Sequence, residues 1–216
     1  FFYHFTIIDD ITNSQKLMIE LKHMEIKILE KQSVHLKGKK ESVLINPNEE
    51  MRKDSKYQSR IFLFTADKYD GMGFTGDNIL IRAPGEYEIG GVEINGYNSG
   101  NENTLYIINI DGIKIVFLGD LDETLSDKRI EKIDSADVLL APVLIKGSAS
   151  GKLVLDWAKK WGVNYLIPVG YDDNNKTNLD NFLDQADQEG LEAIEFLKVD
   201  KDDLPDGLEL KVLKKV

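Results

Sequence analysis

The chain has 216 residues, of which 42% are hydrophobic and 30% are charged; this composition indicates one sizeable folded domain and excludes wholesale disorder. Its formal net charge of −11 disfavours nucleic-acid and anionic-membrane partners, because both require a basic face. Cysteine is absent, which excludes disulfides, thiolate metal ligands and a cysteine nucleophile, and fits the reducing cytoplasm where we expect the protein to work. No apolar run approaches the ~20 residues that a bilayer-spanning helix needs.

A regular pattern of short hydrophobic segments starts at Met24. Residues 1–23 precede this pattern, and we predict that they form an N-terminal extension outside the domain. No internal repeat and no low-complexity linker divides the remainder of the chain. Residues 24–216 are therefore predicted to be a single domain.

The first half of this domain is rich in short β-type segments. Strands are predicted in residues 25–30, 33–37, 42–46, 61–65, 78–83, 87–91, 92–97, 104–110 and 113–118. The apolar run IFLFT, residues 61–65, is typical of a strand buried on both faces, whereas the polar residues 48–60 predict a loop. Asp111-Gly112 predicts the clearest hairpin, because an Asp-Gly turn matches the twist of the strands that flank it.

The second half alternates helices with strands. Helices are predicted in residues 125–133, 150–162 and 178–190, and strands in 138–143, 164–170 and 208–213. Thr124 or Ser126 would cap the first helix, while Ser150 would cap the second and Gly162 would end it. Strands followed by strand–helix alternation predict an α/β (α+β) protein with two packed sheets and helices outside them.

Three stretches resemble ligand-binding loops but lack the context that such loops need. Gly71, Gly73 and Gly76 spell the dinucleotide motif G-x-G-x-x-G, but no helix follows to bind a pyrophosphate. Residues 146–153, KGSASGKL, lack the glycine spacing and the Ser/Thr of a phosphate loop. In residues 172–178, DDNNKTN, a calcium loop counted from Asp173 would have Asp184 at its twelfth position but Asn178 at the sixth, where such a loop needs glycine. We predict ordinary loops at all three.

The histidine content argues against two common catalytic sites. Only His4, His23 and His35 occur, and the first two lie in the predicted extension. A histidine-rich zinc site cannot be built from them. A serine triad would have only His35 as its base, and no G-x-S-x-G motif is present. Because His35 lies in a predicted strand, we expect it to be a structural histidine with its hydrogen bonds satisfied.

Several segments together resemble the metallo-β-lactamase-fold, zinc-dependent hydrolase-like proteins, and in particular a small bacterial branch related to the lactonases. The segments are PGEYEIGGVEINGY (84–97), NTLYIINIDGIKIVFLGDLDETLSDKRIEKI (103–133), ADVLLAPV (136–143), LIPVGY (166–171) and KVDKDDLPDGLELKVLKK (198–215). The resemblance covers nearly all of residues 24–216. It implies a four-layer αββα sandwich with a metal site along one edge of the two sheets.

The resemblance also assigns positions to the metal ligands. In active relatives the loop after the IFLFT-like strand carries H-x-H-x-D-H, and these four ligand positions fall on Ala66, Lys68, Asp70 and Gly71. The aspartate of an L-G-D element falls on Asp120, which is kept. The last histidine, in an I-P-x-H-Y element, falls on Gly170.

Further departures from the family pattern concern the same site. The loop before the NTLY segment offers no histidine, and an early Asp-Pro element has become Asn46-Pro47. Two carboxylates remain at the mapped positions, while no imidazole does. Since zinc in such proteins takes three or four ligands that include nitrogen, we expect a vestigial pocket with no bound metal and no other cofactor.

Lys68 suggests a physical reason for this pattern. If Asp70 and Asp120 converge as the resemblance implies, their charges repel each other. The Lys68 ammonium, placed where a ligand imidazole would lie, would then replace the positive charge of the metal. In the alternative, Lys68 extends into solvent while Asp70 caps a turn, and the sequence leaves both interpretations open.

Two functions are consistent with these residues. The first is a hydrolase-like protein with an eroded metal site that is catalytically inactive and acts by binding or assembly, with an unknown small polar ligand or a second copy of itself as partner. The alternative is a hydrolase of phosphodiester, lactone or similar ester bonds. It would use a weak oxygen-ligated metal or acid–base chemistry between a lysine and an aspartate. The missing histidines favour the inactive form but leave the question of an enzyme open.

Overall fold

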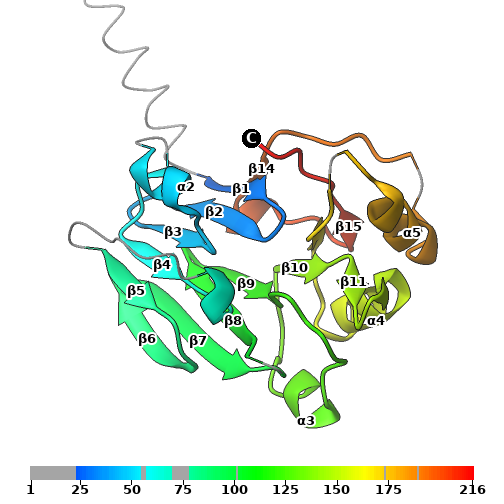
Figure 1. The fold of residues 1–216 in the computed structure, drawn as a ribbon, viewed down its shortest axis with the longest axis horizontal. Helices are drawn as coiled ribbons and strands as arrows, with labels where there is room; N and C mark the ends of the chain where they lie inside the picture. The colour runs from blue at the N-terminus through cyan, green and yellow to red at the C-terminus, as the bar shows by residue number, and fades with distance from the viewer. Residues whose placement is uncertain (1–22, 55–56, 70–77, 101, 173, 189) are drawn as a thin grey trace, which may run out of the picture.

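The computed structural model describes residues 23–54, 57–69, 78–100, 102–172, 174–188 and 190–216. Within these residues the chain forms two large sheets that pack face to face, with helices on the outer faces (Figure 1). The first sheet has six strands in the order β14-β1-β2-β3-β4-β5. They are β14 (Leu197–Val199), β1 (Met24–Glu30), β2 (Ser33–Lys37), β3 (Ser42–Ile45), β4 (Ile61–Leu63) and β5 (Ile79–Ile81).

The second sheet has seven strands in the described part of the chain, in the order β15-β13-β10-β9-β8-β7-β6. They are β15 (Glu209–Leu210), β13 (Tyr165–Val169), β10 (Val138–Pro142), β9 (Ile113–Phe117), β8 (Thr104–Ile110), β7 (Val92–Asn98) and β6 (Gly85–Ile89). A short hairpin joins β11 (Leu144–Ile145) to β12 (Ser148–Ala149). The predicted hairpin between β8 and β9 is confirmed, since Ile110 pairs with Ile113. Asp111 and Gly112 both have positive φ, 54° and 80°, as a type I′ turn requires.

The helices lie outside the two sheets. Among the described residues the α-helices are α2 (Glu49–Lys53), α3 (Asp127–Ile130), α4 (Gly151–Lys160) and α5 (Thr177–Gln185), and the 3-10 helices are η2 (Asp67–Tyr69) and η3 (Lys201–Asp203). The predicted loop at residues 48–60 was wrong in part, because α2 occupies its first part and the Asn48 side chain accepts a hydrogen bond from the Met51 amide. Ser150 is the N-cap residue of α4, as predicted, but its side chain does not form the predicted capping hydrogen bond. Its hydroxyl donates to the carbonyl of Pro142 at 2.5 Å and does not bond an α4 amide.

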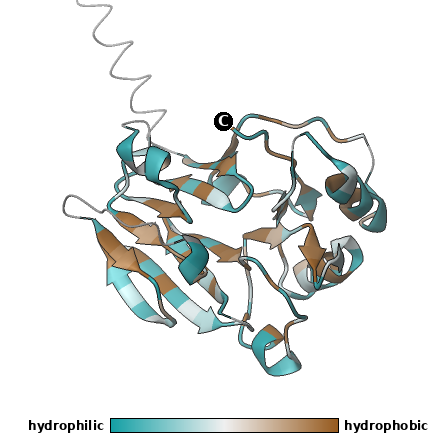
Figure 2. Ribbon diagram, in the orientation of Figure 1, coloured by the Kyte–Doolittle hydropathy of each residue, from teal (hydrophilic) through white to brown (hydrophobic). Residues whose placement is uncertain are grey.

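Three hydrophobic layers hold the sandwich together. The largest cluster fills the space between the two sheets, with residues such as Ile28, Leu36 and Phe117 fully buried. A second cluster packs α3, α4 and α5 against the seven-stranded sheet, and a smaller one packs Met51 of α2 against the six-stranded sheet. Figure 2 shows hydrophobic residues concentrated in the central strands, while α2 and α3 are mostly hydrophilic. The predicted αββα sandwich is thereby confirmed.

No helix in the described ranges has the length and apolar character needed to cross a membrane. The predicted extension, residues 1–23, falls outside the described residues except for its last one. His23 lies directly before β1, and its Nδ1 is 3.3 Å from a carboxylate oxygen of Asp200.

His35, on β2, is buried to 3% exposure and contacts Tyr57 edge-on, with ring centroids 5.8 Å apart. Its Nε2 has no hydrogen-bond partner among the described residues, so the expectation of a satisfied histidine was wrong for this nitrogen. Burial, together with the positive charges of Lys27 and Lys37, lowers the pKa of His35 to about 4. The imidazole is therefore neutral in the folded protein at neutral pH.

Acid will destabilise the fold through His35. In the unfolded chain its pKa is 6.5 and in the folded protein about 4, so between these values only the unfolded chain binds the proton, and the free energy of unfolding falls as the pH falls. The full loss is about 3 kcal/mol. Urea unfolding at pH 7 and pH 4 should show a smaller pH-dependent loss in His35→Leu than in wild type. An equal loss in the two proteins would contradict this assignment.

Candidate functional site

The candidate site lies at one edge of the sandwich, where strand ends from both large sheets meet. The amide of Thr104, at the start of β8, donates to the carbonyl of Thr65, just beyond β4, at 2.7 Å. The hydroxyl of Tyr106 donates to the carbonyl of Phe64 at 2.9 Å. These bonds fix the loop after β4 against the seven-stranded sheet.

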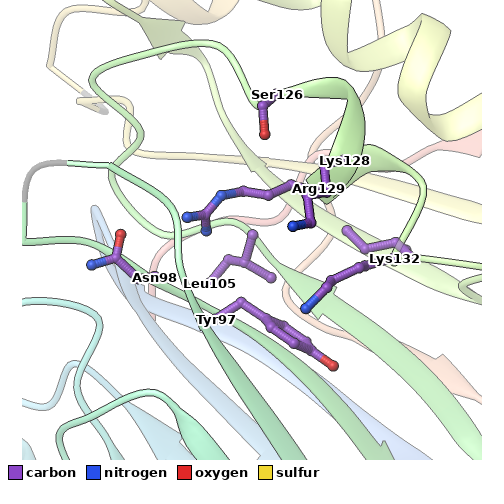
Figure 3. Close-up of a pocket in the computed structure, with 8 residues that line it drawn as sticks. Tyr97, Asn98, Leu105, Ser126, Lys128, Arg129 and Lys132 are labelled. Atoms are coloured by element: carbon purple, nitrogen blue, oxygen red, sulfur yellow. The ribbon is translucent and has the colours of Figure 1, made fainter.

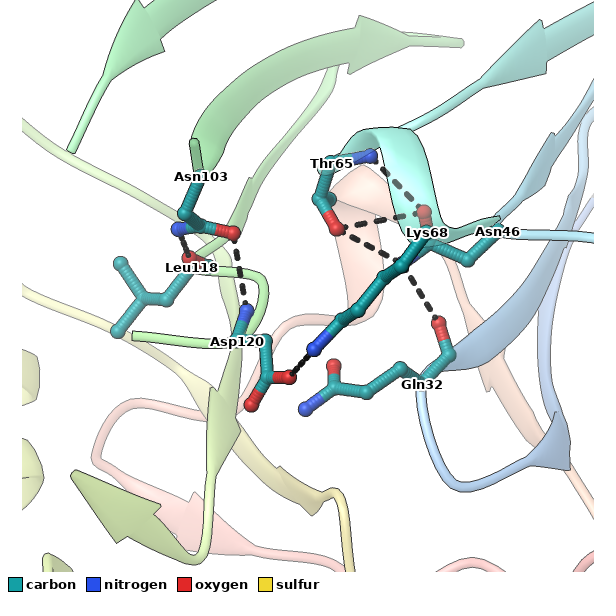
Figure 4. A network of polar contacts seen from close by, with 7 residues as sticks. All are labelled: Gln32, Asn46, Thr65, Lys68, Asn103, Leu118 and Asp120. Carbon is teal, nitrogen blue, oxygen red and sulfur yellow. Dashed lines mark hydrogen bonds and ion pairs between the residues drawn. The ribbon is translucent and has the colours of Figure 1, made fainter. Parts of the chain in front are cut away.

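Asn46, which follows β3, organises the six-stranded side of the site (Figure 4). It is 2% exposed and has a positive φ of 48°, which asparagine tolerates better than most residues. Its Oδ1 accepts from the amide of Thr65 at 2.9 Å. Its Nδ2 donates to the carbonyl of Gln32 at 3.2 Å and to Thr65 Oγ1 at 3.0 Å. One side chain therefore joins the β1–β2 turn to the loop after β4.

Asp120, which follows β9, is placed by its neighbours in the L-G-D element. Gly119 has a φ of 69°, and a Cβ on it would lie 2.4 Å from Asn103 Oδ1, so only glycine fits there. Asn103 Oδ1 accepts from the Asp120 amide at 3.1 Å. Asn103 Nδ2 donates to the carbonyl of Leu118 at 2.9 Å and to Ser99 Oγ at 2.7 Å.

Lys68 and Asp120 form an ion pair between Nζ and Oδ2. Lys68 lies on η2, the single turn that follows β4, and this turn directs its side chain toward the end of β9 (Figure 4). The two side chains remain 58% and 41% exposed, so water screens the pair and its contribution to stability is small, about 0–1 kcal/mol. The main effect of the pair is electrostatic, because the positive charge of Lys68 neutralises the negative charge of Asp120 at this edge of the sandwich.

Gln32 fills space beside Gly170. The Gln32 side chain is 7% exposed, and its Oε1 has no hydrogen-bond partner among the residues described. A Cβ on Gly170 would lie 2.9 Å from Gln32 Nε2, and Gly170 has a φ of 84°. The Gly170 amide also donates to the carbonyl of Lys31 at 2.5 Å. In Figure 4 the Gln32 amide points toward the Lys68–Asp120 pair.

The structure thus brings together part of the predicted set. Lys68 and Asp120 are in contact, while Ala66 lies between Thr65 and η2 and supplies no polar side chain. Gly170 borders the site through Gln32. Asp70 and Gly71 lie outside the described residues, and so does the motif at Gly71, Gly73 and Gly76.

Sequence reasoning missed Gln32, Thr65 and Asn103. Asn103 offers a usable signal, since an asparagine directly before a strand often bonds nearby backbone. Gln32 and Thr65 offer none, because their roles depend on contacts between distant segments.

Two of the rejected motifs have plain structural roles. Residues 146–153 form the β11–β12 turn and the start of α4, where a Cβ on Gly151 would lie 2.0 Å from the carbonyl oxygen of Phe182. That glycine therefore permits the close approach of α4 and α5. In residues 172–178 an Asp172 carboxylate oxygen accepts from the Asn174 amide at 3.0 Å, as in an ordinary turn.

The donor set of this site does not fit zinc. Within the described residues no group of three or more histidine, cysteine, aspartate or glutamate side chains could hold a metal ion. Counting Asp70 as well, the positions assigned by the resemblance supply two carboxylates and no imidazole, and zinc sites need more ligands, with nitrogen among them. Asp120 is also engaged by an ammonium group, which would repel a cation.

Comparison with known proteins agrees with this fold. A family model described as the β-lactamase superfamily domain matches residues 25–170. The chain therefore belongs to the β-lactamase superfamily, and its two-sheet sandwich is that of the metallo-β-lactamase-like proteins. A search of curated proteins finds no significant match.

Solved structures share the fold at low sequence identity. A Thermotoga maritima protein assigned to the zinc-dependent hydrolases of the metallo-β-lactamase superfamily has 23% identity and a TM-score of 0.72, over 88% of this chain and 99% of that one. The metallo-β-lactamase fold protein YhfI from Bacillus subtilis has 10% identity and a TM-score of 0.58, over 89% and 97%. Igni18, a metallo hydrolase from the archaeon Ignicoccus hospitalis, has 12% identity and a TM-score of 0.56, over 82% and 99%. At sequence identities this low, the similarity to these three proteins concerns the fold alone.

Proposed function

We propose that this protein is a catalytically inactive member of the superfamily that acts by binding or assembly. The observation that carries the proposal is the Lys68–Asp120 ion pair, which lies where the resemblance assigns two metal ligands. An ammonium at that place supplies positive charge without a vacant coordination position. It therefore cannot activate a water molecule or polarise a carbonyl or phosphoryl oxygen as a zinc ion does.

The packing around Gly170 supports the same proposal. The side chain of Gln32 takes up the volume next to the backbone position assigned to the last histidine. The position also has left-handed backbone geometry, which favours glycine. A histidine side chain at this position would therefore meet both backbone strain and the Gln32 amide.

A small polar ligand or a second copy of the chain is the proposed partner, and a bacterial cytoplasm is the proposed setting. The absence of cysteine and the bacterial character of the branch that the sequence resembles support this setting. The partly exposed Lys68 and Asp120 side chains would offer a small polar molecule one donor group and one acceptor group.

One observation favours a second candidate function, a hydrolase of phosphodiester, lactone or similar ester bonds. The Lys68–Asp120 pair is partly exposed, so a substrate could reach an ammonium and a carboxylate that lie side by side. Such a pair could share acid–base work without a tightly held metal, or Asp120 could help to hold a weak oxygen-ligated cation.

Hydrolysis assays distinguish the two candidates. We expect no turnover of phosphodiester or lactone substrates above the uncatalysed rate, with or without added zinc or manganese. Metal-dependent turnover would contradict the proposal. Metal-independent turnover that Lys68→Ala abolishes would establish the second candidate instead, provided that Lys114→Ala leaves the rate unchanged. Lys114 is a matched control, because it pairs with Asp134 in another part of the molecule.

A further inference from the structure

A hollow lies away from the candidate site, between α3 and the outer face of the seven-stranded sheet (Figure 3). Its volume is about 320 Å³, which is at the small end of the range for ligand sites. It is lined by Tyr97, Asn98, Leu105, Ser126, Lys128, Arg129, Lys132 and Ile133. The hollow therefore combines an apolar floor with a polar rim.

The rim is positively charged. Lys128, Arg129 and Lys132 line the hollow, and the described residues of its lining include no carboxylate. None of the three cations forms an ion pair within the part of the chain that the structure describes. Three such groups converge here although the chain as a whole carries a net charge of −11. The local field favours an anion inside the hollow, whereas the rest of the surface repels a long polyanion.

The floor and the remaining polar groups of the hollow indicate which kind of molecule could bind there besides an anionic group. Leu105 and Ile133 are buried in the floor, and the half-buried Tyr97 ring forms one wall, with Lys132 Nζ 5.1 Å from its centroid. Ser126 precedes α3, but its hydroxyl does not cap the helix. Ser126 and Asn98 line the same hollow. A ligand with an apolar or planar body and an anionic end matches both surfaces.

The α3 wall is held in place from below. Ile130 and Ile133 belong to the buried cluster that packs α3 against the seven-stranded sheet. The indole Nε1 of Trp161 donates to the carbonyl of Ile130 at 3.0 Å. The backbone that carries Lys128, Arg129 and Lys132 is thus fixed before any ligand arrives, which reduces the ordering cost of binding.

We infer that this hollow is a binding site for a small organic phosphate with a planar or apolar body, of the size class of a nucleoside monophosphate. A phosphate dianion accepts hydrogen bonds from guanidinium and ammonium groups together, and these charge-assisted bonds are strong. The Tyr97 ring, Leu105 and Ile133 contact the body of the ligand. The site does not depend on the Lys68–Asp120 pair, so it is expected whether the protein is an enzyme or a binding protein.

Isothermal titration of the full chain at low ionic strength tests this inference. The titrants are the four common nucleoside 5′-monophosphates and phenyl phosphate, with adenosine and inorganic phosphate as separate arms. We expect at least one organic phosphate to bind more tightly than both adenosine and inorganic phosphate. Replacing both Lys128 and Arg129 by glutamine should weaken that binding at least about tenfold.

Lys152→Gln is the matched control, since it removes one positive charge from an exposed position on α4 that does not line the hollow. The Lys152→Gln protein should bind the organic phosphate with an affinity within about twofold of wild type. The thermal midpoint of the Lys128/Arg129 double variant should match that of wild type, because the substituted side chains are on the rim. Four outcomes would overturn the inference. They are no binding by any organic phosphate, equal binding of inorganic phosphate or adenosine, no effect of the double substitution, and tighter binding of a short single-stranded RNA.

Discussion

Replacing Gly170 by histidine will lower the free energy of unfolding by about 3 kcal/mol, even though this substitution returns the residue that the family resemblance assigns to the position. Two physical effects add. The φ of 84° is a left-handed conformation, which costs a residue with a Cβ about 1–2 kcal/mol. The new Cβ would also lie 2.9 Å from Gln32 Nε2, so a buried amide must move.

Two comparisons separate these effects. Gly147 also has a positive φ, 71°, but a Cβ there would meet no atom within 4 Å. Gly147→His therefore measures the backbone strain alone and should cost only about 1–2 kcal/mol. In a Gln32→Ala background the cost of Gly170→His should fall toward that of the control, which gives a coupling of about 1–2 kcal/mol in a double-mutant cycle.

Chemical denaturation of the four proteins of the cycle and the Gly147 control supplies the required free energies. If Gly170→His costs no more than Gly147→His, or if Gln32→Ala does not reduce the cost, then Gln32 does not occupy the place of the imidazole. Such a result would remove the packing argument for the proposed loss of the metal centre.

Replacing Asn46 by alanine will lower the free energy of unfolding by about 3–4 kcal/mol. The side chain is buried and bonds the Thr65 amide, the Thr65 hydroxyl and the carbonyl of Gln32. Its removal leaves buried polar groups without partners, and each such group costs about 1–3 kcal/mol before the structure relaxes. Alanine is also strained at the φ of 48° that this position adopts.

Asn46→Asp sharpens this prediction, because it keeps the shape and restores the aspartate of the Asp-Pro element. The carboxylate still accepts from Thr65 but cannot donate to the carbonyl of Gln32, so we expect a cost of about 2 kcal/mol at pH 8. The cost should be smaller near pH 5, where a protonated carboxyl group regains a donor.

Asn109→Ala is the control, because Asn109 is only partly buried and donates to a single carboxylate, that of Glu93, at 3.2 Å. Its substitution should cost less than about 1 kcal/mol. A cost for Asn46→Ala no larger than that of the control would mean that the Asn46 network does not join the two sides of the site.

Local sequence patterns predicted much of the fold. The Asp111-Gly112 turn predicted the β8–β9 hairpin because its backbone requirement is local. The α2 helix was missed although its signal was present, since Asn48 is followed by two acidic residues in the first turn. The short strand β14 was missed because only its pairing with β1 defines it.

The candidate site was less predictable, for a physical reason. The contact of Lys68 with Asp120 joins residues 52 positions apart, and only the family resemblance suggested it. The place of Gln32 follows from a turn between β1 and β2 that meets the end of β13, and no local pattern encodes such a meeting. Left-handed geometry at Gly170 is likewise consistent with many roles until the neighbouring side chain is known.

We propose that the Lys68–Asp120 ion pair has taken the place of the metal centre. The most direct test is the metal content of the full chain, purified without chelator, incubated with zinc and then dialysed against zinc-free buffer. We expect the protein to retain far less than one equivalent of zinc. Retention of a stoichiometric, tightly bound zinc ion would contradict this proposal.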